Sequence, residues 1–225
     1  LDNLDHPDLI ILCTPTSAYS EITNQISKSV SKKTIMTDIG SSKGNSYLKI
    51  IKKLSRSKID YLSSHPMVGS EKSGIRFSKT NMFENKIVFI IDKNTVNRRT
   101  YDEINSFWLS IGANTHNINK NKHDDLMAQT SHISHLMSYI FMESLPQSVI
   151  DNNLPLLLGG GIKEHVRLSR SDPRMWSDIF INNKKNIKKS VNVIEKNISK
   201  IKLLIEQSDD KNLKELLNKI QSKTT

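Results

Sequence analysis

Cysteine is nearly absent from this sequence: Cys13 is the single cysteine among 225 residues. One thiol cannot form an intramolecular disulfide, and such usage is typical of a reducing compartment, so we predict a cytoplasmic protein. Cys13 lies in an apolar, strand-like run, which predicts an inert buried thiol. No apolar run is long enough to span a bilayer and no signal peptide opens the chain, so we expect no membrane association.

Aromatic residues are also few, at 6% of the chain, and offer few platforms for stacking nucleic-acid bases. The net charge of +10 comes from lysines that are scattered along the chain and dense in 184–202, not from an arginine-rich patch. No zinc-finger spacing and no basic region followed by a leucine heptad is present. We therefore expect no nucleic-acid partner; binding through the basic helical half would instead show affinity that falls steeply with salt.

Short apolar runs alternate with helix-like segments in the first half of the chain. With 36% hydrophobic residues, the sequence can bury a core. The predicted strands are 8–14, 34–39, 59–63 and 86–91, and the predicted helices are about 17–30, 43–54 and 95–110. Strands that alternate with helices indicate a mostly parallel sheet with helices on both faces. We predict an α/β domain over 1–118.

Strand patterns disappear from about residue 119 onward. Residues 123–145 form one long predicted helical segment, another long helix begins near Pro173, and a short one covers 209–225. The helix after Pro173 carries an apolar stripe at three- and four-residue steps. Its members are Trp176, Ile179, Phe180, Ile187, Val191, Ile194, Ile198, Ile201 and Ile205. Such a stripe packs either against helices of a second subunit or inside an intramolecular core, and the pattern fits both equally.

Polar and small residues follow three of the predicted strands. Thr14-Pro15, Asp38-Ile-Gly40-Ser41 and His65 all stand at carboxyl ends, where open parallel sheets bind ligands, so we expect one pocket at this edge. Ser41 and the backbone N–H groups beside it suit a hydroxyl or anionic ligand, although a helix-capping serine explains them as well. His65 can exchange a proton near neutral pH, but a lone histidine is more often structural.

A second polar cluster lies in the helical half. His132 and His135 stand three residues apart on one helix, but no convincing third ligand accompanies them, so we predict no metal site. His135 is better explained as a side chain that projects into a ligand cleft. Arg167 follows the glycine-rich segment 159–161, and its planar fork can bind both oxygens of a carboxylate. A surface salt bridge is the alternative for this arginine.

Together these motifs resemble the prephenate dehydrogenase family, including its cyclohexadienyl and arogenate dehydrogenase members. The resemblance runs from Asp8 to about Glu206. The motifs that carry it, in order, are Thr37-Asp-Ile-Gly-Ser-Ser-Lys43, His65-Pro-Met-Val-Gly-Ser-Glu-Lys-Ser-Gly74, His123-Asp124, Ser131-His-Ile-Ser-His135, and Gly159-Gly-Gly161 through Arg167 to Ser171-Asp-Pro-Arg-Met-Trp176. It implies a partial Rossmann-like, dinucleotide-binding domain over 1–118 and an all-helical substrate and dimerisation domain over 119–225, hence a homodimer.

The resemblance also implies an activity: oxidative decarboxylation of prephenate or L-arogenate in tyrosine biosynthesis, with hydride transfer to NAD or NADP. His65 corresponds to the catalytic histidine of the family, Ser41 to a serine that supports it, and Arg167 to the arginine that holds a substrate carboxylate. The other positions that match the family's pocket are Ser70, Glu71, His135, Lys163 and Trp176. We expect Thr14, Pro15, Asp38 and Gly40 to belong to the cofactor side.

Two departures from the family pattern stand out. Ser134 replaces the usual proline of Ser-His-Leu-Pro-His, so a helix bend near His135 is expected to change. The Gly-x-Gly-x-x-Gly turn and the acidic ribose-binding residue would precede Asp8, and neither is present. We therefore expect these 225 residues to be a fragment that binds a dinucleotide poorly and is catalytically inactive. A non-catalytic remnant that binds an aromatic metabolite is the alternative, and the sequence distinguishes neither the two substrates nor the two cofactors.

Overall fold

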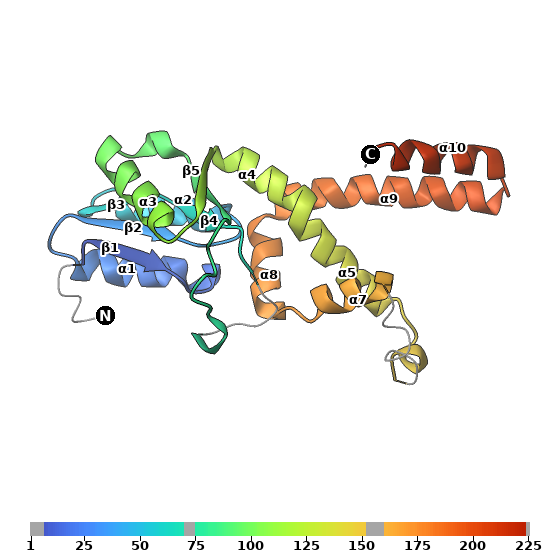
Figure 1. The fold of residues 1–225 in the computed structure, drawn as a ribbon, viewed down its shortest axis with the longest axis horizontal. Helices are drawn as coiled ribbons and strands as arrows, with labels where there is room; N and C mark the ends of the chain where they lie inside the picture. Colours follow the sequence, from blue (N-terminus) through green and yellow to red (C-terminus); the bar gives the residue numbers. More distant parts are fainter. Residues whose placement is uncertain (1–6, 70–74, 152–159, 224–225) are drawn as a thin grey trace.

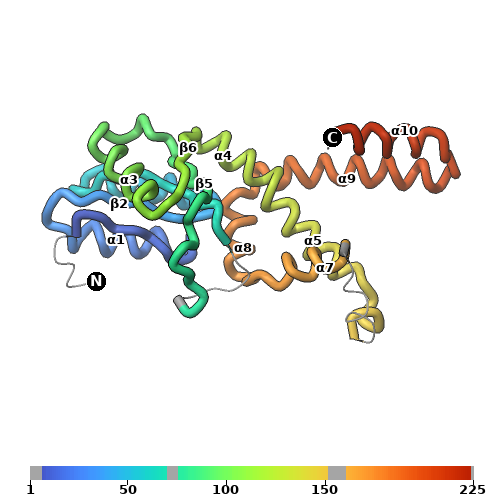
Figure 2. The backbone as a smooth tube through the Cα atoms, viewed as in Figure 1, coloured from blue at the N-terminus to red at the C-terminus, as the bar shows by residue number. Residues whose placement is uncertain are grey.

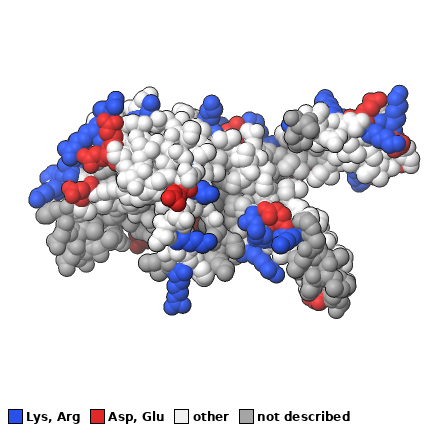
Figure 3. Space-filling view, viewed as in Figure 1, with Lys and Arg blue, Asp and Glu red and all other residues white. Residues whose placement is uncertain are grey.

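The fold is taken from a computed structural model, which describes residues 7–69, 75–151 and 160–223. An α/β half and a helical half lie side by side, and the last two helices of the helical half project away from the rest of the molecule (Figure 1). On the face drawn in Figure 3, Lys and Arg side chains lie in several separate groups, with Asp and Glu side chains among them.

The first sheet contains three parallel strands in the order β1-β2-β3. Their bounds are β1 Leu9–Leu12, β2 Thr34–Asp38 and β3 Ile59–Tyr61, and the helices between them are α1 Tyr19–Ser29 and α2 Asn45–Leu54. All five residues of β2 are buried because this strand is central and covered. Met36 and Ile50 are fully buried in the core between the sheet and these helices. The strands and helices predicted for this region are confirmed within a few residues.

A second sheet continues the α/β half in the order β4-β5-β6. Its strands are β4 Ser64–Pro66, β5 Ile87–Ile91 and β6 Asn114–Ile118, and helix α3 Arg98–Ser110 precedes β6. β6 runs parallel to β5, whereas β4 runs antiparallel to it. The expected mostly parallel sheet is confirmed, but β4 and β6 were not predicted, and His65 lies inside β4 instead of in a turn after a strand.

Apart from its loops, the described part of the second half is helical, and several of its helical elements have both bounds described. They are α4 Lys120–Met127, a π-helical turn at Ala128–His132, α5 Ile133–Glu143, α7 Gly160–Ser169, α8 Pro173–Asn182, α9 Lys184–Glu206 and α10 Asp210–Gln221. The segment predicted as one helix over 123–145 is therefore nearly continuous, and its π-helical turn lies just before Ser134, close to where a changed bend was expected. A π-helical turn inserts an extra residue and often marks a functional position.

The prediction of one long helix after Pro173 is wrong, because the helix is interrupted between α8 and α9. Asn183 stands at the break, buried, and its side-chain amide donates to the Asp124 carbonyl at 2.7 Å. α9 and α10 then pack against each other and extend outward as an arm (Figure 2). Apolar side chains such as Ile198 and Leu217 are about half exposed on this arm.

The prediction of a buried Cys13 is also wrong. Cys13 is exposed and not buried, because β1 ends one residue before it. Helix α1 has no side-chain N-cap hydrogen bond: its N-cap residue is Ala18, which ends a short 3-10 turn at Thr16–Ala18. Within the described ranges, none of the helices combines the length and apolar character needed to cross a bilayer.

Candidate active site

A cavity of about 320 Å³ lies between the α/β half and the helical half. It brings together five of the predicted site residues: Ser41 and His65 from the first half, and His135, Arg167 and Trp176 from the second. The remaining wall is formed by Pro66, Met67, Val68, Gly69, Ser131, His132, Leu168, Ser171, Met175 and Ile179. The sequence motifs therefore converge from both halves on one cavity.

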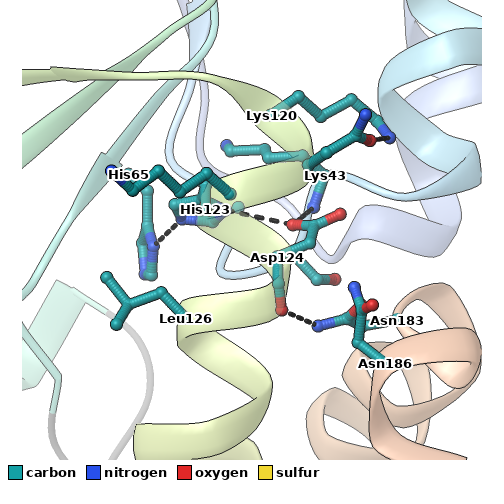
Figure 4. Close-up of polar contacts among 12 residues, drawn as sticks. Lys43, His65, Lys120, His123, Asp124, Leu126, Asn183 and Asn186 are labelled. Atoms are coloured by element: carbon teal, nitrogen blue, oxygen red, sulfur yellow. Dashed lines mark hydrogen bonds and ion pairs between the residues drawn. The ribbon is translucent and has the colours of Figure 1, made fainter. Parts of the chain in front are cut away.

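His65 is held at this cavity by its place in β4. The strand pairs with β5, and His65 stands opposite Phe89. Its Nδ1 lies 2.8 Å from Nε2 of His123, whose ring meets the His65 ring edge to face (Figure 4). Burial, reinforced by the nearby His123, Lys43 and His132, holds the pKa of His65 well below its usual value. His65 is therefore neutral at physiological pH.

Asp38 and Lys43 form a buried ion pair beneath the site, 2.8 Å apart and each 1% exposed. The Asp38 carboxylate also accepts hydrogen bonds from the Gly40 N–H and from the Tyr61 and Ser63 hydroxyls. Burial alone would raise the pKa of Asp38, but the Lys43 ammonium and these donors lower it below its usual value. Both oxygens are thus occupied, so Asp38 shapes the loop after β2 and is not open to a ligand.

The other residues expected on the cofactor side lie near the same sheet edge. Thr14 and Pro15 follow the end of β1 and are exposed, and they are not part of the cavity that contains His65. Gly40 follows β2, where a Cβ would approach an Asp38 carboxylate oxygen and the Thr16 methyl group to 3.0 Å. Glycine is needed there for close packing of the two strand ends.

Two histidines line the cavity, one in the π-helical turn and one in the first turn of α5. His132 is buried, with Nδ1 3.2 Å from the Asn183 amide, and burial lowers its pKa to about 4. His135 stacks on Trp176 with ring centroids 3.6 Å apart, and burial lowers its pKa as well. The buried Nε1 of Trp176 has no hydrogen-bond partner among the described residues. Part of this wall is therefore a flat aromatic surface with a donor that is free for a ligand.

Arg167 reaches the cavity from α7, and its exposed side chain forms an ion pair with Glu164. Lys163 is exposed on the same helix and is not among the residues that line the cavity. Ser70 and Glu71, the remaining predicted pocket residues, lie outside the described residues. No group of three or more His, Cys, Asp or Glu side chains in the described ranges has the arrangement of a metal site.

Three residues that contact the site's histidines had no predicted role. The sequence shows His123 and Asp124 only as part of a motif, and its apolar stripe predicts a continuous helix through Asn183. His123 is fully buried, and its Nδ1 lies 3.0 Å from Asp124 Oδ1. The adjacent His-Asp pair in the sequence is a signal for such a contact, whereas nothing in the sequence around Asn183 points to its partners on α4 and the π-helical turn.

The fold and the cavity define an α/β protein with a helical second half and a cavity between the two halves. Two family models match it: "Prephenate dehydrogenase, nucleotide-binding domain" matches residues 1–117, and "Prephenate dehydrogenase, dimerization domain" matches residues 119–219. The chain belongs to the prephenate dehydrogenase family.

Individual relatives agree with this assignment. The chain is 25% identical over 208 residues to prephenate dehydrogenase of Bacillus subtilis, covering 91% of this chain and 55% of the relative. It is 25% identical over 186 residues to cyclohexadienyl dehydrogenase of Zymomonas mobilis, covering 81% and 62%. The chain thus spans little more than half the length of these curated relatives.

A solved structure supports the same fold. Prephenate dehydrogenase of Aquifex aeolicus, in complex with hydroxyphenyl propionate and NAD+, superposes with a TM-score of 0.84 at 28% identity. The superposition covers 97% of this chain and 76% of that one.

Proposed function

We propose that the protein catalyses the oxidative decarboxylation of prephenate or L-arogenate, with hydride transfer to NAD or NADP, in tyrosine biosynthesis. The observation that carries this proposal is a buried, neutral histidine, His65, in a cavity that also contains Arg167. A neutral imidazole can accept a proton, and a guanidinium can bind a carboxylate, so the cavity suits an acid that also bears a reacting hydroxyl.

In this proposal His65 accepts the proton of the ring hydroxyl. As the O–H bond breaks, its electron pair forms the C=O bond and hydride leaves the same carbon. The bond between the ring and its carboxylate then breaks, CO2 departs, and the bonding electron pair enters the ring. The ring becomes aromatic as the carbonyl oxygen takes a proton back from the protonated His65 and becomes a phenol. Ser41 lines the same cavity and hydrogen-bonds the hydroxyl. Proton transfer to a positioned base typically contributes about 10²- to 10⁴-fold in rate.

The helical half supplies the binding surface for the substrate. Arg167 binds a substrate carboxylate, His135 and Trp176 form the flat wall against the ring, and the free Trp176 Nε1–H donates to an oxygen of the substrate. Lys163 acts from the rim, since it does not line the cavity. Ser70 and Glu71 retain their proposed place at the pocket on the family resemblance alone.

A nicotinamide cofactor fits the carboxyl-end edge of β1 and β2. Thr14 and Pro15 are exposed there, and the buried Gly40, which precedes Ser41, keeps the loop after β2 closely packed. Ligands of open parallel sheets bind at such an edge. When bound, the nicotinamide supplies the acceptor for the hydride. Thr14, Pro15 and Gly40 would contact it, and Asp38 would act by holding their loop.

The proposal also covers the domain division, the oligomeric state and the location of the protein. We place the division between the dinucleotide-binding and helical domains at residues 118 and 119, and we assign a homodimer formed through the helical domain. The exposed apolar side chains of α9 and α10 support the dimer, because an arm of two helices leaves one apolar face uncovered. A cytoplasmic location belongs to this proposal on account of the single cysteine.

The test is the absorbance of reduced nicotinamide with the product of the whole reading frame. Prephenate and L-arogenate are supplied separately, each with NAD and with NADP, beside a His65→Asn variant. We expect turnover with at least one pair and its collapse in the variant. No turnover by a well-folded protein, together with tight binding of hydroxyphenyl propionate, would instead favour a remnant that binds aromatic metabolites.

A further inference from the structure

The His65 ring belongs to a chain of hydrogen bonds that leads away from the cavity. His65 Nδ1 lies 2.8 Å from His123 Nε2, and His123 Nδ1 lies 3.0 Å from Asp124 Oδ1 (Figure 4). All three side chains are buried. This series of hydrogen bonds therefore runs from His65 in β4, at the cavity wall, to Asp124 in helix α4 of the other half.

The direction of these hydrogen bonds is set at the Asp124 end. Asp124 Oδ1 already accepts the backbone N–H of Lys43 at 2.9 Å, and a backbone N–H can only donate. A carboxylate oxygen accepts from both neighbours, so the hydrogen of the His123 contact resides on His123 Nδ1. Burial lowers the pKa of His123, so its ring is neutral and its Nε2 carries a lone pair.

The lone pair of His123 in turn fixes the proton on His65. Nε2 of His123 can only accept, so Nδ1 of the neutral His65 ring must donate. The second nitrogen of His65, Nε2, is then unprotonated. No described residue hydrogen-bonds to this Nε2, and His65 lines the cavity.

We propose that His123 and Asp124 are positioning residues that hold His65 in the Nδ1–H tautomer, with the lone pair of Nε2 directed to a substrate hydroxyl. The assignment deepens the proposed function and rests on it for the identity of the substrate. An orienting carboxylate behind a catalytic imidazole performs the same task in hydrolytic triads. Here a second imidazole extends the reach of the carboxylate.

One residue, Lys43, holds both ends of this series of hydrogen bonds. Lys43 donates its backbone N–H to Asp124, and its ammonium donates to the Ser64 carbonyl at 2.7 Å, directly before His65. The ammonium also pairs with Asp38. Asp124 and the residue before His65 therefore both bond to the loop that carries Lys43, which explains why the two histidine rings are held at hydrogen-bonding distance.

The tautomer is measured by long-range ¹H–¹⁵N correlation of the histidine side chains in the full-length protein, with His65 assigned by comparison with His65→Asn. We expect His65 to carry its proton on Nδ1. His123→Phe keeps a ring but removes the acceptor, and Asp124→Ala removes the group that orients His123, so each should give a mixture of His65 tautomers. Asp124→Asn keeps an oxygen acceptor at the same place and should retain the native tautomer.

Exposed His116 on β6 provides the matched control: His116→Phe should leave the His65 signals unchanged. A His65 proton on Nε2 in the unmodified protein, or an unchanged tautomer in both His123→Phe and Asp124→Ala, would overturn the assignment. The spectrum needs no turnover, so it reports on His123 and Asp124 even if the proposed reaction fails. Where turnover is found, His123→Phe should lower kcat by roughly 10- to 1000-fold and change KM by less than about threefold.

Discussion

The guanidinium of Arg167 holds the Glu164 carboxylate by two hydrogen bonds, Nε to Oε2 at 2.9 Å and Nη2 to Oε1 at 2.5 Å. This two-bond geometry is the one an arginine uses to bind any carboxylate. The hydrogen bonds from Arg167 lower the pKa of Glu164 below its usual value, so the glutamate is ionised at neutral pH. A substrate carboxylate that binds Arg167 must therefore displace Glu164 or share the guanidinium with it.

We accordingly expect Glu164→Gln to strengthen the binding of a carboxylate ligand. The competing charge is removed while the side chain keeps its size, and an exposed pair of this kind corresponds to a roughly two- to fivefold gain in affinity. Isothermal titration with hydroxyphenyl propionate measures the change. Glu103→Gln breaks a similar exposed pair with Arg99 on α3 and should leave the affinity unaltered. Weaker binding in Glu164→Gln would show that Glu164 itself contributes to the site.

The buried pair of Asp38 and Lys43 leads to a prediction about stability. Lys43→Met leaves a carboxylate buried without its cation, which costs about 3–5 kcal/mol of unfolding free energy. The double variant Asp38→Asn, Lys43→Met removes both charges and should recover a large part of that loss. Urea unfolding followed by circular dichroism measures both. Equal losses in the single and double variants would mean that packing, not charge, is responsible.

The contact between Gly44 and Asn182 joins the two halves closely. A Cβ on Gly44 would overlap the Asn182 carbonyl oxygen at the end of α8. Gly44→Ala should therefore force the halves apart and lower the unfolding free energy by about 1–3 kcal/mol. Gly161 in α7 is the comparison, since no described atom lies within 4 Å of a Cβ there, and Gly161→Ala should stabilise the helix by up to about 1 kcal/mol. A harmless Gly44→Ala would contradict the packing seen here.

The buried histidines predict a loss of stability in mild acid. The pKa of His132 is lowered from 6.5 to about 4 in the folded protein, so between these values only the unfolded chain binds the proton. The stabilisation is thus complete above pH 6.5 and falls as the pH drops toward 4, by roughly 3 kcal/mol in total for His132. Urea unfolding between pH 7.5 and 4.5 measures the slope, which should be shallower in His132→Gln. An identical slope in that variant would assign the acid sensitivity to other groups.

How far the sequence predicts the fold depends on the strength of each local pattern. β2 and β5 are recognisable because apolar, β-branched runs have the length of buried strands. β6 is not, since Asn114-Thr-His-Asn-Ile118 is mostly polar and is a strand only because it pairs with β5. Likewise, β4 contains Pro66 and only three residues, and its backbone is extended by pairing with β5.

The residues of the site also differ in whether the sequence predicts them. Motifs led to His65, Arg167 and Trp176, because particular side-chain chemistry at particular spacings is visible in the sequence. The break at Asn183 could not be predicted, since the apolar stripe continues across it. The partners of its side-chain amide nitrogen, Asp124 and His132, lie more than 50 residues away in the sequence. Whether Thr14 and Pro15 contact a cofactor stays a prediction.

The proposed reaction depends most on a neutral, buried His65 that acts as the proton acceptor. The dependence of kcat/KM on pH tests it directly, because this ratio reports the free enzyme. Since burial lowers the pKa of His65, the unprotonated base persists below pH 6.5, and kcat/KM should fall with a one-proton slope only at lower pH. An acid limb with its midpoint below 6.5, absent from the residual activity of His65→Asn, is the expected result. A midpoint at or above 6.5, or the same limb in the variant, would contradict the assignment of His65 as the base.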